Sequence, residues 1–175
     1  KRTKGGFKMI KKVAILANGG DVAGFNAVIR GIVKTAENSD VECYGFIDGY
    51  NGLLKNEYVK LSTAEEGNAE GILPKGGSII GSSTNANVFN YKVIGENGEV
   101  EYKDLSDVCV ENIKKDEFDC IFTLGGDGTQ KSARDFSTKG VNVIGVPKTI
   151  DNDVACTDIT FGYNTAVSVA AEALD

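Results

Sequence analysis

Histidine is absent from the 175-residue sequence, and no apolar run approaches the length of a membrane-spanning helix. The lack of histidine removes the commonest general base and metal ligand, so acid–base chemistry falls to Asp, Glu, Lys, Cys or Tyr. A spanning helix needs roughly 20 apolar residues, so no membrane association is predicted. Residues 1–8 are rich in lysine but lack the apolar core of a signal peptide, and we interpret them as an extension or a cloning remnant.

Paired cysteines and an excess of basic residues are missing as well. The four cysteines are widely spaced and form no CxxC pair, which argues against a disulfide framework or a zinc site. We therefore expect reduced thiols and a cytoplasmic protein. A net charge of -6 and a pI near 4.8 argue against nucleic-acid and anionic-membrane partners. Phosphate binding stays open, because backbone amides at a turn bind phosphate whatever the net charge.

Short apolar runs alternate with longer amphipathic stretches, which is typical of an α/β protein. Strands are predicted at residues 12–17, 41–47, 120–124 and 142–146. Helices are predicted at residues 24–38, 64–73, 105–115, 130–138 and 161–174, and a hairpin at 86–103 around the turn sequence ENGE. The pattern predicts a Rossmann-like three-layer sandwich with a mainly parallel sheet, incomplete in this chain. Ligands bind such sheets beyond the carboxyl ends of the strands.

Three glycine-rich turns lie next to these predicted elements. They are GGD at 19–21, GGSIIG at 76–81 and GGDGT at 125–129. Glycine lets the backbone approach a phosphate closely, and the helix start beyond such a turn offers free amides and a positive dipole end. One turn alone is about as often a plain strand–helix connection, but three together favour an extended polyphosphate ligand. Neither the GxxxxGK[ST] pattern nor a GxGxxG fingerprint is present.

Asp127 lies inside the third glycine turn. A carboxylate beside a phosphate site repels the ligand unless a cation lies between them, so this position predicts a Mg²⁺ ligand. The alternative interpretation is an aspartate that caps the following helix.

The segment PKTIDND at 147–153 follows the last of these predicted strands, so we expect it at the same sheet edge as the glycine turns. Its two aspartates, Asp151 and Asp153, suggest a division of labour in which one accepts a proton and the other is held by structure or near the cation. Lys148 supplies a compact positive charge for phosphate. With the glycine turns and Asp127, the segment completes the cradle, cation site, base and cation clamp that phosphoryl transfer requires.

Four motifs of the sequence resemble those of the phosphofructokinase family. GGDVAGFNAVIR at 19–30 resembles the GGDAPGMNAAIR opening of that family. GGSIIGSS at 76–83, GGDGT at 125–129 and PKTIDND at 147–153 resemble its GGTxLGSS-type segment, nucleotide loop and catalytic loop. The order and spacing agree from about residue 9 to residue 175. NAD kinases and lipid kinases share GGDG, but they do not predict PKTIDND at this spacing.

The resemblance implies a glycolytic 6-phosphofructokinase, a Mg²⁺-dependent transferase that moves a phosphoryl group from ATP to the 1-hydroxyl of fructose 6-phosphate. It implies Asp151 as the base that accepts the hydroxyl proton and Asp127 as the metal ligand. Further implied catalytic or sugar-phosphate-binding residues are Lys148, Thr149, Ile150 and Asp153. The implied nucleotide-binding residues are Gly20, Tyr50, Thr84, Asn85, Gly126, Asp127, Gly128 and Thr129. For Tyr50, a packing role is an equal alternative.

The family has ATP-dependent and pyrophosphate-dependent branches, and this sequence carries signs of both. Gly128 leaves room for the α-phosphate of ATP, where pyrophosphate-dependent members carry an aspartate. Lys148 is typical of the pyrophosphate branch, although some ATP-dependent members share it. Because Gly128 bears directly on whether the nucleotide fits, ATP is the expected donor and pyrophosphate the alternative. Thr84 stands where bacterial ATP-dependent enzymes usually have an arginine that helps to neutralise the transferring phosphate.

Members of this family continue well past the point that matches residue 175. The resemblance therefore implies a partial nucleotide-binding domain at 9–146, then the catalytic loop and first helix of a truncated sugar-phosphate-binding domain at 147–175. The remaining portion supplies most groups that grip fructose 6-phosphate, so we expect little or no kinase activity from residues 1–175 alone. The full-length protein is expected to be a homo-oligomer, either a tetramer or a dimer. A regulatory module that binds nucleotide without catalysis is the alternative of another class, and the threonine at position 84 favours it slightly.

Overall fold

A computed structural model describes residues 9–84 and 87–174. The expected nucleotide contact Asn85 and the N-terminal residues 1–8 lie outside the described residues. The strands are β1 (Lys12–Ala17), β2 (Glu42–Phe46), β3 (Tyr58–Leu61), β4 (Tyr91–Ile94), β5 (Val100–Lys103), β6 (Cys120–Gly125), β7 (Val143–Thr149) and β8 (Phe161–Gly162). The helices are α1 (Phe25–Glu37), α2 (Tyr50–Lys55), the 3₁₀ turn η1 (Val88–Asn90), α3 (Ser106–Lys115), α4 (Asp127–Thr138) and α5 (Tyr163–Leu174).

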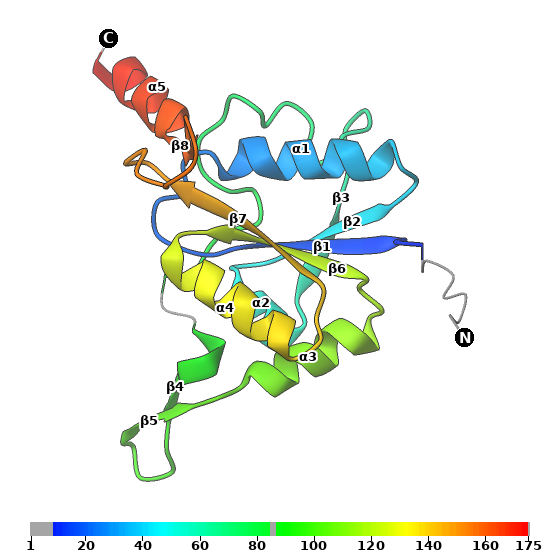
Figure 1. Ribbon diagram of the computed structural model, residues 1–175, viewed down its shortest axis with the longest axis vertical. Helices are drawn as coiled ribbons and strands as arrows, with labels where there is room; N and C mark the ends of the chain where they lie inside the picture. The colour runs from blue at the N-terminus through cyan, green and yellow to red at the C-terminus, as the bar shows by residue number, and fades with distance from the viewer. Residues whose placement is uncertain (1–8, 85–86, 175) are drawn as a thin grey trace.

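Six strands form the main sheet in the order β3-β2-β1-β6-β7-β8. Every neighbouring pair is parallel except β2 and β3, which are antiparallel. α1 covers one face of the sheet, and α2, α3 and α4 cover the other (Figure 1). This arrangement confirms the predicted three-layer α/β sandwich with a mainly parallel sheet.

Alternate residues of β1 supply the two hydrophobic cores. Val13, Ile15 and Ala17 pack with α1, whereas Ala14 and Leu16 pack with the helices on the opposite face. None of the five is more than 4% exposed. A strand buried on both faces carries apolar residues on both, which accounts for the unbroken apolar run VAILA that follows Lys12.

The sheet reverses its winding direction between β1 and β6. From β1 the chain passes through α1 to β2 on one side, and from β6 it passes through α4 to β7 on the other. The carboxyl ends of β1 and β6 therefore lie at a topological switch point, where doubly wound sheets bind ligands.

The sequence-based prediction fails at one helix and misses several short elements, among them the strand β8 at the start of the helix predicted at 161–174. The prediction of a helix at 64–73 is wrong, because these residues form a succession of turns. Glu66 and Gly71 adopt left-handed φ angles of 65°, which a right-handed helix does not contain. The short helix α2 and the antiparallel strand β3 were not predicted. α4 begins at Asp127 instead of residue 130, and β7 runs three residues beyond its predicted end, so the proposed domain boundary at 146/147 falls inside this strand.

Glu37, the last residue of α1, holds the start of this turn-rich loop. Its carboxylate accepts hydrogen bonds from the hydroxyl and backbone N–H of Thr63 and from the Ser62 hydroxyl. These bonds, led by the Thr63 hydroxyl, lower the pKa of Glu37 below its ordinary value. A lowered folded-state pKa stabilises the fold above the unfolded-state pKa, and this stabilisation is lost as the pH falls through the folded-state pKa.

We expect Glu37→Gln to lower the free energy of unfolding by about 1 kcal/mol at pH 7, since the bonds are charge-assisted but open to solvent. The variant should also lose less stability than the parent between pH 5 and pH 3, because it has no carboxylate to protonate. Urea denaturation followed by circular dichroism at several pH values measures both effects. Glu111→Gln, on the exposed surface of α3, is the control and should change neither. If Glu37→Gln and the parent lost the same amount of stability between pH 5 and pH 3, Glu37 would not have this role.

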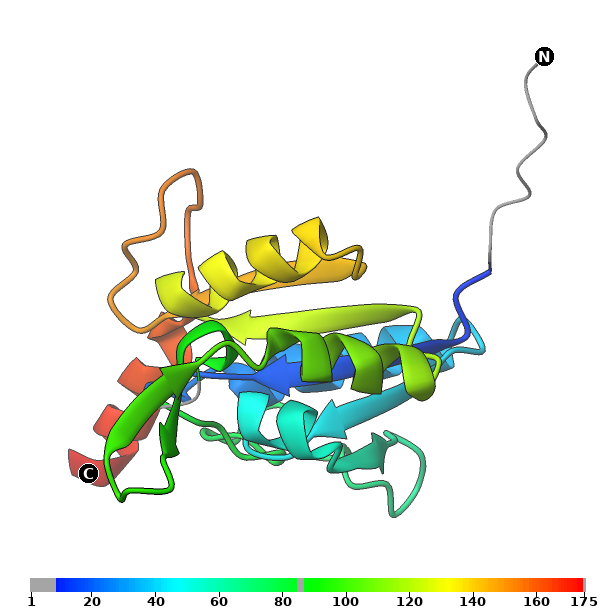
Figure 2. The same cartoon turned by 90° about the horizontal axis from the view of Figure 1, so that it is seen from below.

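The two-stranded hairpin β4–β5 projects from the body of the molecule and confirms the hairpin predicted around ENGE. In Figure 1 the hairpin lies at the bottom of the molecule and α5 at the top, and Figure 2 again shows the hairpin (green) at the periphery. None of the helices in the described parts of the chain is both long and apolar enough to cross a membrane.

Candidate active site

The predicted phosphate-handling segments meet at the carboxyl edge of the sheet. The parallel register pairs Ala17 with Leu124 and Gly125 with Pro147, so β1, β6 and β7 reach this edge side by side. The backbone N–H of Asn18 then donates to the carbonyl of Leu124 at 2.9 Å, which fixes the first glycine turn against β6. Motifs more than 100 residues apart in the sequence therefore line one site.

Two adjacent pockets open at this edge. The larger, of about 470 Å³, is lined by Gly19, Gly20, Asp21, Gly126, Asp127, Gln130, Pro147, Lys148, Thr149, Asp153, Val154 and Ala155. The smaller, of about 260 Å³, is lined by Asn18, Gly19, Tyr50, Thr84, Asn87, Gly126, Asp127, Gly128, Thr129 and Ser132. Gly19, Gly126 and Asp127 line both pockets, so an elongated ligand can pass from one to the other along bare backbone.

The glycines of the GGDG turn serve different purposes. A Cβ atom on Gly125 would lie 2.2 Å from the Asn18 carbonyl oxygen and 2.4 Å from the Thr129 hydroxyl, so the fold itself requires glycine there. A Cβ on Gly128 would meet no atom within 4 Å. Since packing does not require Gly128, its lack of a side chain leaves space on the wall of the smaller pocket.

The start of α4 points a helix N-terminus at both pockets. Gly126 is the N-cap and makes no side-chain capping bond, so the first amides of α4 remain available to an anion. Asp127 is the first helical residue and not the cap, which makes the capping interpretation wrong. Its exposed side chain has no hydrogen bond or ion pair to any residue that the structure describes.

The carboxylates here suit a cation that phosphate helps to bind. Within the described residues, no group of three or more His, Cys, Asp or Glu side chains is arranged to hold a metal ion. Asp127, Asp21 and Asp153 nevertheless line the larger pocket with oxygen donors. Mg²⁺ typically binds through one or two carboxylates together with substrate phosphate oxygens and water. The residues present therefore fit Mg²⁺ delivered with a polyphosphate, and Asp127 lies where the two pockets meet.

The TIDND loop is fixed at its base and open at its tip. The Thr149 hydroxyl accepts a hydrogen bond from the backbone N–H of Asp151 at 3.1 Å, and the Thr160 hydroxyl donates to the Thr149 carbonyl at 3.1 Å. The side-chain oxygen of Asn152 accepts from the backbone N–H of Thr160 at 3.0 Å. Asp151 is exposed and lies in the sequence between Thr149 and Asp153, which line the larger pocket, but it is not itself one of the lining residues. Ile150 instead lines a separate apolar groove beside α5.

The Lys148 side chain is buried in the wall of the larger pocket. It is 5% exposed, its ammonium donates to the carbonyl oxygen of Asp21, and it lies 5.2 Å from the centre of the Phe25 ring. Burial lowers the pKa of Lys148, while the nearby carboxylates of Asp21 and Asp151 oppose that shift. Its ammonium group thus ties β7 to the first glycine turn.

Known proteins resemble this chain in sequence and in fold. The model of the phosphofructokinase family matches residues 12–175. The chain belongs to the phosphofructokinase family. It is 55% identical over 167 residues to ATP-dependent 6-phosphofructokinase 2 of Clostridium perfringens, covering 95% of this chain and 45% of that protein. It is 39% identical to ATP-dependent 6-phosphofructokinase 3 of Bacteroides thetaiotaomicron, covering 94% and 46%.

Solved phosphofructokinase structures share the fold. The chain superposes on the Pichia pastoris enzyme with a TM-score of 0.75 at 25% identity, covering 98% of this chain and 19% of that one. A pyrophosphate-dependent phosphofructokinase from Marinobacter aquaeolei gives a TM-score of 0.68 at 25% identity, covering 95% and 42%. The chain spans less than half the length of the curated relatives it matches.

Tyr50, for which the resemblance left nucleotide binding and packing as equal alternatives, is packed in the core and also reaches the smaller pocket. Its ring stacks on Phe136 with a centroid distance of 6.0 Å, and the residue is 1% exposed, so it is a core residue. It also lines the smaller pocket. Burial raises the pKa of its hydroxyl above the ordinary value.

Several residues that line these phosphofructokinase pockets were not predicted from the sequence. They are Asn18, Asp21 as a pocket residue, Asn87, Gln130, Ser132, Val154 and Ala155. Gln130 follows Asp127 by three positions in α4 and Ser132 follows Gly128 by four, so this helical spacing is a signal that was available. Asn87 lies beyond Thr84 on an irregular segment and has no such periodicity.

Proposed function

We propose that this chain carries the phosphoryl-transfer part of an ATP-dependent 6-phosphofructokinase. The proposed reaction moves the γ-phosphoryl group of ATP to the 1-hydroxyl of fructose 6-phosphate and yields fructose 1,6-bisphosphate and ADP. The observation that carries this proposal is the pair of pockets joined at Gly19, Gly126 and Asp127. The joint offers bare backbone and one free carboxylate, which is where a transferring phosphoryl group needs amide donors and a cation.

In this proposal Asp151 takes the proton from the 1-hydroxyl as the hydroxyl oxygen bonds to the γ-phosphorus. The bond from that phosphorus to the β–γ bridging oxygen breaks, and ADP leaves. Asp151 suits the role because it is exposed in the loop between Thr149 and Asp153, which line the larger pocket, and because the N–H bond to the Thr149 hydroxyl fixes its backbone. Mg²⁺ bound by Asp127 and the phosphate oxygens would neutralise charge on the transferring group.

Asp153, Lys148 and Thr149 would shape the acceptor side, since all three line the larger pocket. Gly20 faces the same pocket, whereas Thr84, Gly128 and Thr129 face the smaller one. We accordingly assign residues 9–146 to nucleotide and phosphate binding and residues 147–175 to the acceptor side. Ile150 remains a proposed sugar-phosphate contact of the complete polypeptide.

The ATP donor is favoured over pyrophosphate by the smaller pocket. Pyrophosphate has no nucleoside to place there, whereas the bare backbone of Gly128 leaves that wall open to an α-phosphate. The curated relatives cited above are named ATP-dependent, while one structural neighbour is pyrophosphate-dependent. Pyrophosphate is therefore the second candidate donor, and Lys148 is the residue that favours it.

A cytoplasmic location and an oligomeric complete protein are part of the same proposal. All four cysteines are free thiols, which supports a reducing compartment. α5 exposes Val167, Val169 and Leu174, so it has apolar surface available for packing against further protein.

Calorimetric titration of the chain with MgATP and with magnesium pyrophosphate tests the donor assignment. We expect one MgATP per chain, a weaker complex with pyrophosphate, and loss of MgATP binding when EDTA removes the cation. Tighter binding of pyrophosphate would transfer the proposal to the second donor. Failure to bind either ligand would overturn it.

A further inference from the structure

Asn51, in the first turn of α2, connects two segments that are distant in the sequence. Its side-chain amide donates to the Ser83 hydroxyl at 3.2 Å, and its side-chain carbonyl accepts from the Tyr91 hydroxyl at 3.2 Å. Ser83 belongs to the GGSIIGSS segment, and Tyr91 is the first residue of β4. Asn51 therefore uses both ends of its amide to hold the hairpin base and the glycine-rich segment together.

Ser83 in turn braces the first glycine turn. Its carbonyl accepts from the backbone N–H of Gly19 at 3.0 Å, and the Ser82 hydroxyl donates to the Gly19 carbonyl at 2.6 Å. The next residue, Thr84, lines the smaller pocket, and its methyl group lies 3.2 Å from the position a Cβ on Gly20 would occupy. A shift of Ser83 would displace Gly19 and Thr84 together.

The other end of the connection is anchored in the core. Val88 is fully buried, and the Phe89 ring packs on Phe136 with a centroid distance of 4.9 Å. The Val88 carbonyl accepts from the backbone N–H of Leu105 at 2.7 Å. Tyr91 thus starts from a fixed base, although the tip of the hairpin is exposed.

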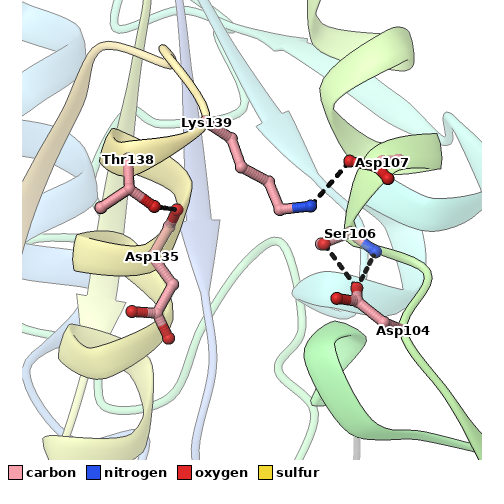
Figure 3. Close-up of polar contacts among 6 residues, drawn as sticks. All are labelled: Asp104, Ser106, Asp107, Asp135, Thr138 and Lys139. Carbon is pink, nitrogen blue, oxygen red and sulfur yellow. Dashed lines mark hydrogen bonds and ion pairs between the residues drawn. The ribbon is translucent and has the colours of Figure 1, made fainter.

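The segment that follows the hairpin is held from both sides. Asp104 accepts from the backbone N–H of Ser106 at 2.9 Å, and Lys139 at the end of α4 forms an ion pair with Asp107 at 2.7 Å (Figure 3). α4 is the helix whose other end forms the joint between the pockets. The segment after the hairpin and the nucleotide side of the site therefore both contact α4, at its opposite ends.

We propose that Asn51 is a positioning residue for the nucleotide side of the site. It holds Ser83, and through Ser83 it sets the place of Thr84 and Gly19 against α4. This inference rests on the proposed function, because it takes the smaller pocket as the nucleotide pocket. Pyrophosphate, which needs only the joint and the larger pocket, should depend on Asn51 much less than ATP does.

Asn51→Ala should raise the Kd for MgATP about tenfold, the loss expected when one or two hydrogen bonds no longer fix the pocket wall. The Kd for magnesium pyrophosphate should change less than about threefold, since the joint retains its own amides. Tyr91→Phe, which removes only one of the two bonds, should weaken MgATP binding by a smaller factor in the same direction.

Two variants serve as matched controls. Asn68→Ala removes an amide that also makes two hydrogen bonds, to the backbone of Ser62 and Lys60, but far from the pockets. Tyr102→Phe removes a hydroxyl from the same hairpin at an exposed position. Both should leave the Kd for MgATP unchanged.

Amide hydrogen exchange of the unliganded chain tests the positioning step separately from the ligand. Exchange at the Gly19 amide should accelerate in Asn51→Ala, while exchange at the Glu42 amide should not. The Glu42 amide donates to the Lys11 carbonyl at 2.8 Å, on the edge of the sheet far from the pockets. Equal weakening of both ligands, or no change at Gly19, would overturn the inference. If the parent chain bound neither ligand, the proposed function would fail, and the Gly19 exchange rate would still decide the role of Asn51.

Discussion

Asp151→Asn is expected to lower the kcat for fructose 6-phosphate phosphorylation by about 10²- to 10⁴-fold, the range that a positioned general base contributes. The complete natural polypeptide that carries these residues is the sample for this assay, because the chain spans less than half the length of its curated relatives. The KM for MgATP should change little, since Asp151 is not among the residues that line the smaller pocket, where we place the nucleotide.

The fold should tolerate this substitution. Asp151 is exposed, and among the residues that the structure describes its one hydrogen bond runs from its backbone N–H to the Thr149 hydroxyl. Asp158→Asn is the control, because it removes an equally exposed carboxylate from the same loop. Near-parental kcat in Asp151→Asn, with Asp158→Asn equally active, would show that another group takes the proton.

Gly128→Asp is expected to raise the Kd for MgATP at least about 100-fold, equivalent to about 2.7 kcal/mol, while pyrophosphate binding changes little. The new carboxylate would stand on the wall of the smaller pocket, where it would crowd and repel an α-phosphate. The fold should accommodate the aspartate, since a Cβ atom at position 128 would meet no atom within 4 Å. A carboxylate in the first turn of α4 also interacts favourably with the helix dipole.

Ser137→Asp is the matched control for that substitution. It adds the same charge to the opposite, exposed end of α4 and should leave both Kd values unchanged. Calorimetric titration with the two donors provides the measurement. Equal loss of ATP and pyrophosphate in Gly128→Asp would mean that Gly128 serves the shared joint, and the assignment of the smaller pocket to the nucleotide would be wrong.

The parts of the fold that sequence reasoning predicted are those with long, regular patterns. The run KVAILA of β1 and the helical spacing in α1 and α3 were sufficient to place those elements. α2 has only six residues, including Gly52, which is too short to show a helical period. The turns at 64–73 come directly after Ser62 and Thr63, which bond to Glu37 from 25 and 26 positions away, and no local pattern reveals that contact.

The site was predictable to the extent that its motifs are contiguous. GGDGT and PKTIDND indicated which segments meet at the sheet edge, and the parallel register brings them together. The burial of Lys148 against Phe25 was not predictable, because it depends on how α1 packs over β7. The contact of Asn51 with Ser83 and Tyr91 was equally hidden, since these residues are separated by 32 and 40 positions.

The central claim is that the two joined pockets transfer a phosphoryl group from ATP to a sugar phosphate. Phosphorus-31 NMR of the complete natural polypeptide with MgATP and fructose 6-phosphate tests it most directly. We expect signals of ADP and of a new phosphate ester on the 1-carbon of the sugar to grow at equal rates. Transfer from pyrophosphate but not from ATP, or hydrolysis of ATP to inorganic phosphate without a new ester, would contradict it.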